Sequence, residues 1–206
     1  MAITNYSDLK TTVANYLART DLTAQIPDFI QLAEVRLRRD LRIRQMLKSV
    51  TTTTTGGDAT VSLPSDFLEL RDLFVDTNPA RDLQYVTPSI FSRNGRTTES
   101  GLMVFYTILA DEIKFAPTPD TNYTLEMLYY AAPALLSDSN VSNVFLANCP
   151  DLVLYGSLIE AEPYLMNDAR IQLWAGMYDR GLASLTASDD RAESSGVPLQ
   201  MKVSAR

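Results

Sequence analysis

Residues 27–46 of this chain are PDFIQLAEVRLRRDLRIRQM, and this stretch predicts a long amphipathic helix. Pro27 suits the first turn of that helix, where its missing N–H would have no partner within the helix. An apolar residue recurs about every four positions along one side, at Phe29, Ile30, Ala33, Leu37 and Leu41. This stripe predicts that the helix buries one face against the rest of the protein.

The other faces of the predicted helix carry clustered positive charge. Five arginines fall within nine positions, namely Arg36, Arg38, Arg39, Arg42 and Arg44. Residues 1–48 hold eight Lys and Arg against five Asp and Glu, whereas the rest of the chain holds ten against twenty. Two interpretations stay open. The arginines form either a solvated face with ion pairs, such as Glu34 with Arg38, or a contact surface for an acidic protein or nucleic acid.

The composition argues against catalysis and metal binding. The chain has no histidine, which is the usual acid or base near neutral pH and the commonest metal ligand. Its single cysteine, Cys149, precedes Pro150 at a predicted helix start and is expected to be a buried small residue. No GxSxG, P-loop, GxGxxG or HExxH pattern occurs. An enzyme would need a site of carboxylates alone, and a metal site at Asp111–Glu112 would need further acids placed by the fold. We therefore expect no catalytic residue, metal or cofactor.

The sequence also predicts a soluble protein made in a cytoplasm. The first residues, MAITNYSD, lack the basic start and apolar run of a signal peptide. No stretch approaches the roughly twenty apolar residues that span a bilayer. With 206 residues, of which 46% are apolar, the chain can bury a core as one domain.

Both ends of the chain predict helices. Ser7 can cap a first helix, which ends near Arg19. A later helix starts at Pro150 and is kinked or ended by Pro163, and Asn167 or Asp168 can cap the last one. Their apolar stripes are Leu9, Val13, Tyr16 and Leu17; then Tyr155, Leu158, Ile159 and Leu165; then Ile171, Trp174, Tyr178, Leu182 and Leu185. Together with the basic helix, these segments predict a core of four helices from distant parts of the chain.

The middle of the chain predicts strands. SVTTTTT (49–55) and DATVSL (58–63) flank Gly56–Gly57, a pair that can take positive φ and therefore predicts a hairpin. A turn at residues 64–66 leads into an alternating segment. Further strands are expected at Met103–Ile108, Glu112–Phe115 and Tyr123–Tyr130, with a hairpin tip at Asp111–Glu112 and one face formed by Leu125, Met127 and Tyr129.

These patterns predict an α+β fold, mainly a bundle of four helices from both chain ends with an inserted antiparallel β-region. We expect a single domain over residues 1–192, with helical parts at 1–47 and 133–192 and the β-rich insertion at 48–132. Residues 193–206 form a C-terminal tail. Its apolar residues alternate with others in strand periodicity, at Val197, Leu199, Met201 and Val203. The tail is either disordered or adds as a strand to an exposed sheet edge on assembly.

Four stretches, taken in order, resemble a bacteriophage family. They are the opening helix, PDFIQLAEVRLRRDLR (27–42), LPSDFLELRDL (63–73), and the pair PDLVLYGSLIEAEPYL (150–165) and RIQLWAGMYDRGLASL (170–185). Together they resemble the head-to-tail adaptor family, also called tail tubular protein A-like, of short-tailed and related tailed phages. The resemblance covers most of residues 1–190.

The resemblance implies a structural virion protein of the neck between capsid and tail, assembled in the host bacterial cytoplasm. It implies a ring of about twelve copies that docks on the portal protein and receives a tail or nozzle protein. Viral DNA would pass through the channel without specific binding, and no membrane is involved. The five arginines and the four apolar tail residues are then candidate subunit or portal contacts.

The alternative is a nucleic-acid-binding regulator that uses the arginine-rich helix 27–46 on phosphates. The sequence pI of about 4.6 counts against this alternative.

Overall fold

A computed structural model describes residues 3–19, 21–94, 99–165 and 168–194. The helices are α1 (Tyr6–Leu17), α2 (Ile26–Asp40), a 3₁₀ turn η1 (Arg44–Met46), α3 (Pro88–Asn94), α4 (Val144–Asn148), α5 (Pro150–Leu165) and α6 (Asp168–Ser194). The strands are β1 (Leu47–Thr53), β2 (Thr60–Ser62), β3 (Phe67–Val75), β4 (Arg81–Asp82), β5 (Gln84–Tyr85), β6 (Phe105–Leu109), β7 (Glu112–Ala116) and β8 (Thr124–Ala131). The predicted α+β class is confirmed.

The chain divides into two compact units. The helical unit comprises Met1–Gln45 with Pro133–Arg206, and the β unit comprises Met46–Ala132. The sequence predicted one domain with a β-rich insertion at 48–132, and whether the two units fold as one domain stays a prediction.

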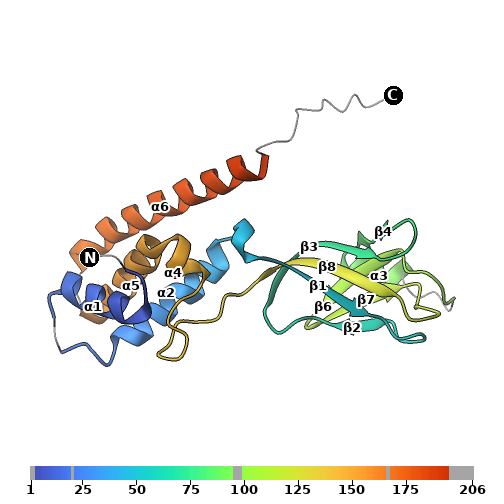
Figure 1. Ribbon diagram of the computed structural model, residues 1–206, viewed down its shortest axis with the longest axis horizontal. Helices are drawn as coiled ribbons and strands as arrows, with labels where there is room; N and C mark the ends of the chain where they lie inside the picture. The colour runs from blue at the N-terminus through green and yellow to red at the C-terminus, as the bar shows by residue number, and fades with distance from the viewer. Residues whose placement is uncertain (1–2, 20, 95–98, 166–167, 195–206) are drawn as a thin grey trace. The chain divides into compact units, whose positions relative to one another are not determined.

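Helix α5 is the centre of the helical unit. It packs against α1, α2, α4 and α6, so helices from the two ends of the chain, blue and orange in Figure 1, lie together. Gly156 of α5 permits this packing. A Cβ at Gly156 would lie 3.0 Å from the Cβ of Ala33 on α2 and 3.6 Å from Cε2 of Tyr178 on α6. The predicted four-helix core is therefore formed by α1, α2, α5 and α6.

Helix α1 begins one residue after Asn5, whose side chain accepts a hydrogen bond of 2.9 Å from the N–H of Asp8. The prediction of Ser7 as the cap was wrong, because Ser7 lies inside the helix and Asn5 has the extended backbone of a cap. The predicted stripe is buried except at Tyr16, which is 46% exposed.

Helix α2 buries its predicted stripe but ends earlier than predicted, at Asp40 rather than Met46. Leu41 has an extended backbone, with φ −115° and ψ 131°. The reason lies in the spacing of the next apolar residues. Leu41 and Ile43 are both fully buried, and side chains two residues apart share one face in extended chain but not in a helix.

The late helices follow the predicted pattern with one difference. Helix α5 continues two residues beyond Pro163 to Leu165, so this proline does not end the helix. Trp174 and Tyr178 of α6 are buried, as the predicted stripe requires. Asn167 lies outside the described residues, and Asp168 is the first residue of α6.

The β unit contains two four-stranded sheets, with strand orders β1-β8-β3-β4 and β2-β7-β6-β5. All strand pairs are antiparallel except β5 with β6. Strands β6 and β7 form the predicted hairpin, in which Ala110 takes φ 54°. Leu125, Met127 and Tyr129 are buried on one face of β8, as predicted, and join residues of both sheets in one core.

The predicted hairpin around Gly56–Gly57 was wrong. Strand β1 pairs with β8 through seven residue pairs, whereas β2 pairs with β7 in the other sheet. The two glycines instead let the chain approach the loop before β8. The N–H of Gly56 donates to Asn122 Oδ1 at 2.9 Å, and the N–H of Gly57 donates to the carbonyl of Pro119 at 2.8 Å. Of the two, Gly57 has positive φ, at 86°.

Candidate assembly surface

The five arginines predicted as contacts lie in the helical unit, on α2 and the segment that follows it. Arg36 forms an ion pair with Glu160 of α5. The guanidinium of Arg38 donates to the carbonyl of Pro133, where the chain returns from the β unit. These two side chains therefore hold α2 to other parts of the helical unit.

Arg42 and Arg44 also make bonds within the helical unit. Nη1 of Arg42 donates to the carbonyls of Arg38 and Leu41, both at 2.8 Å, and so satisfies carbonyls at the C-terminus of α2. The backbone N–H and Nε of Arg44 donate to the two carboxylate oxygens of Asp189 on α6, at 3.1 and 2.9 Å. Four of the five arginines thus have structural partners in their own chain.

Arg39 differs from these four. It is exposed, and the described part of the chain offers neither its side chain nor that of Asp28 a hydrogen bond or an ion pair. Both belong to the solvent-facing side of α2, which we call the α2 stripe and define as Asp28, Leu32, Val35 and Arg39. Leu32 is 50% exposed and Val35 37% exposed, so two partly exposed apolar side chains lie between two opposite charges.

Glu34 does not belong to a solvated face, contrary to one interpretation of the sequence. It is fully buried, and its carboxylate accepts hydrogen bonds from the N–H of Leu136 and from Nδ2 of Asn143. Burial raises the pKa of Glu34, while these donors and the nearby charge of Arg38 lower it in part. Asn143 is also the N-cap of α4, so Glu34 fixes the connection that leads from the β unit into α4 and α5.

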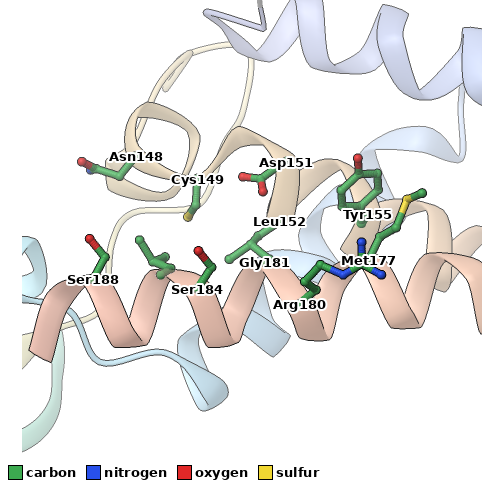
Figure 2. Close-up of a pocket in the computed structure, with 11 residues that line it drawn as sticks. Asn148, Cys149, Asp151, Leu152, Tyr155, Met177, Arg180, Gly181, Ser184 and Ser188 are labelled. Carbon is green, nitrogen blue, oxygen red and sulfur yellow. The ribbon is translucent and has the colours of Figure 1, made fainter.

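An open groove of about 580 Å³ lies between the start of α5 and α6. Figure 2 shows Cys149 and Leu152 on one side of it and Gly181 and Ser184 on the other. The helices approach closely here, since a Cβ at Gly181 would lie 2.8 Å from Cδ2 of Leu152. The lining mixes small, polar and apolar side chains.

Cys149 is buried, as predicted. Burial, together with the nearby charge of Asp151, raises the pKa of its thiol to about 12. A thiol with that pKa stays protonated at neutral pH and is a poor nucleophile. Cys149 therefore acts as a small core residue beside the groove.

The described residues contain no group of three or more acidic or cysteine side chains placed to hold a metal ion. None of their helices combines the length and the apolar character that crossing a bilayer requires. Val197, Leu199, Met201 and Val203, the predicted tail contacts, lie outside the described residues.

The sequence could not identify the partners that the arginines use. Glu160 and Asp189 are more than a hundred residues from α2, and the Pro133 carbonyl carries no side-chain signal. The α2 stripe could have been found, because Leu32 and Val35 are apolar residues outside the buried periodicity of α2.

A family model described as SU10 adaptor protein matches residues 4–202 of the 206-residue chain. No curated protein matches the chain. The chain therefore belongs to the SU10 adaptor protein family, a family of phage head-to-tail adaptors, as the resemblance indicated.

Proposed function

We propose that this member of the SU10 adaptor protein family forms a ring of about twelve copies that docks on the portal and connects it to the tail or nozzle. The match to the adaptor family over residues 4–202 is the observation that carries the proposal. In this role the chain is assembled in the host bacterial cytoplasm and becomes part of the neck of the virion.

The charge of the chain supports a role as part of a DNA channel. The formal net charge is −7, and residues 46–132 hold six Lys and Arg against eleven Asp and Glu. Contacts with phosphates dominate the affinity of proteins for DNA, and an acidic wall disfavours them. A channel wall of this charge would let DNA pass without being held.

The bonds of the arginines favour the adaptor over the regulator. Arg36, Arg38 and Arg44 have partners in their own chain, and α2 ends before Arg42 and Arg44. A helix that read DNA would need these guanidinium groups free for phosphates. Of the five arginines, Arg39 is the one best placed to contact another subunit or the portal.

The test mixes the purified chain with the portal protein of the same phage. Negative-stain images and native mass spectrometry of the complex should show a ring of about twelve adaptor copies on the portal. The chain alone should bind duplex DNA weakly at physiological salt. Failure to bind portal, together with tight and salt-sensitive binding of duplex DNA, would replace the adaptor with the regulator.

A further inference from the structure

The α2 stripe has a two-fold pattern. Each charged residue is separated from the nearer apolar residue by three positions, and two positions separate the two apolar residues. The spacing is therefore the same when the helix is followed in either direction. Turning α2 end over end therefore exchanges Asp28 with Arg39 and Leu32 with Val35. Because the two charges are opposite, the stripe is complementary to a reversed copy of itself.

We propose that the α2 stripe binds the α2 stripe of a second copy, with the two helices antiparallel about a two-fold axis. Each Asp28 then faces Arg39 of the other copy, and each Leu32 faces Val35. With a rise of 1.5 Å per residue, the two ends of the stripe lie about 16 Å apart. Both ion pairs can therefore form together, while like charges stay separated by more than the Debye length of about 8 Å at physiological salt.

The neighbours of the stripe are compatible with this contact. The two-fold axis places Arg36 of both copies on the same side of the contact, offset along the helices by about 7.5 Å, and each Arg36 is paired with Glu160 of its own chain. Leu32 and Val35 are the exposed apolar side chains of α2, and the contact covers both. The antiparallel arrangement thus removes apolar surface from water, and the two Arg36 side chains, which share one flank of the contact, are each neutralised by Glu160 of their own chain.

The expected dimer is weak and specific. One pair of helices buries less than the roughly 1,200 Å² of a standard interface, so association depends on protein concentration. A two-fold contact closes on itself, whereas a ring needs two different faces. The dimer is thus a form of the free chain, and the inference does not rest on the proposed ring.

Sedimentation equilibrium of the full chain at low and high salt tests the proposal. The chain should dimerise at high concentration, and added salt should weaken the dimer. Arg39→Asp and Asp28→Arg should each lower the association constant about tenfold or more, because each replaces two opposite-charge pairs by two like-charge pairs. The double variant Asp28→Arg/Arg39→Asp restores opposite charges and should recover association to within about threefold of the parent chain.

Two further variants keep the result interpretable. Arg81→Asp makes the same charge change at an exposed position of β4 and should leave association unchanged. Leu32→Ser keeps both charges, removes the apolar centre and should weaken association. The melting temperature of each variant checks that it folds.

Three results would overturn the proposal: a parent chain that stays monomeric at the highest concentrations reached, a double variant that folds but does not recover, or undiminished association of the Leu32→Ser variant. If the double variant does not fold, the Leu32→Ser result decides.

Discussion

Arg44 donates its backbone N–H and its Nε to the carboxylate of Asp189, a residue 145 positions later in the chain. The Asp189 side chain is 11% exposed, whereas that of Arg44 is 44% exposed, so the carboxylate is the more enclosed partner. The pair joins the segment after α2 to the last turns of α6. Most other residues in those turns are exposed, and the ion pair is therefore a principal attachment of this end of α6.

The first prediction concerns this attachment. Asp189→Ala removes the acceptor of both hydrogen bonds and should cost about 1–2 kcal/mol locally. Amide hydrogen exchange in the C-terminal part of α6 should become faster, while exchange in α5 stays unchanged. Asp190→Ala, at the neighbouring exposed position, is the matched control. Equal exchange in the two variants would show that the Arg44–Asp189 pair does not hold the helix.

The second prediction concerns the buried carboxylate of Glu34. Glu34→Ala leaves the N–H of Leu136 and the amide of Asn143 without their acceptor and should lower the free energy of unfolding by about 2–4 kcal/mol. Glu34→Gln keeps one acceptor oxygen and should cost less, about 1 kcal/mol. Urea unfolding of the three proteins measures both effects. A Glu34→Ala variant as stable as the parent chain would contradict the buried network.

The third prediction concerns the pH dependence that Glu34 contributes. Because burial raises the pKa of Glu34, the folded chain binds this proton more tightly than the unfolded chain. Its contribution to stability is therefore largest below the ordinary glutamate pKa of about 4.3 and falls as the pH rises through the raised pKa. The difference in free energy of unfolding between the parent chain and Glu34→Gln should shift against the parent chain over that range. If this difference instead moved in favour of the parent chain as the pH rises, the prediction would be wrong.

The fourth prediction separates two neighbouring arginines. Arg38→Glu places a carboxylate against the carbonyl of Pro133 and near the buried Glu34, so it should lower the melting temperature strongly. Arg39→Glu changes an exposed side chain and should leave the melting temperature nearly unchanged. If assembly on the portal uses this side of α2, Arg39→Glu should block it while the chain stays folded. A folded Arg39→Glu variant that assembles normally would remove Arg39 from the candidate contacts.

The fifth prediction concerns the tail. Deleting residues 196–206 should leave the melting temperature nearly unchanged and weaken attachment to the portal, if Val197, Leu199, Met201 and Val203 add as a strand to a sheet edge of a neighbour or the portal. Pull-down of portal by the full and shortened chains compares the two. Equal binding would show that the tail makes no contact.

Local periodicity was enough to predict most helices and the longer strands. Short-range spacing defines the apolar stripes of α1, α2 and α6 and the alternation of β8. Such spacing can be read directly from the order of the residues. The small elements β4, β5, α3 and α4 gave no such signal, because strands of two residues and helices of fewer than two turns are too short to show their periods.

Two of the errors arose where a local preference competed with the packing of the folded chain. Gly56–Gly57 is a strong turn signal, yet β1 gains a longer antiparallel pairing with β8 than β2 could offer, so the glycines serve a close approach instead. The end of α2 at Asp40 was likewise decided by the burial of Leu41 and Ile43, which extended chain allows and a continued helix does not.

By itself, the sequence determined the α+β class, the order of the longer helices and strands, and the family resemblance, since all three depend on residue order and short periods. Only the tertiary structure decided what the arginines contact. A guanidinium on a helix face has the same sequence signature whether it meets solvent, a second copy or a carboxylate 145 residues away. In the folded chain Arg36 contacts Glu160, Arg38 contacts the carbonyl of Pro133, and Arg44 contacts Asp189. Among the residues that the structure describes, Arg39 meets no such partner and is therefore the exposed arginine of the α2 stripe.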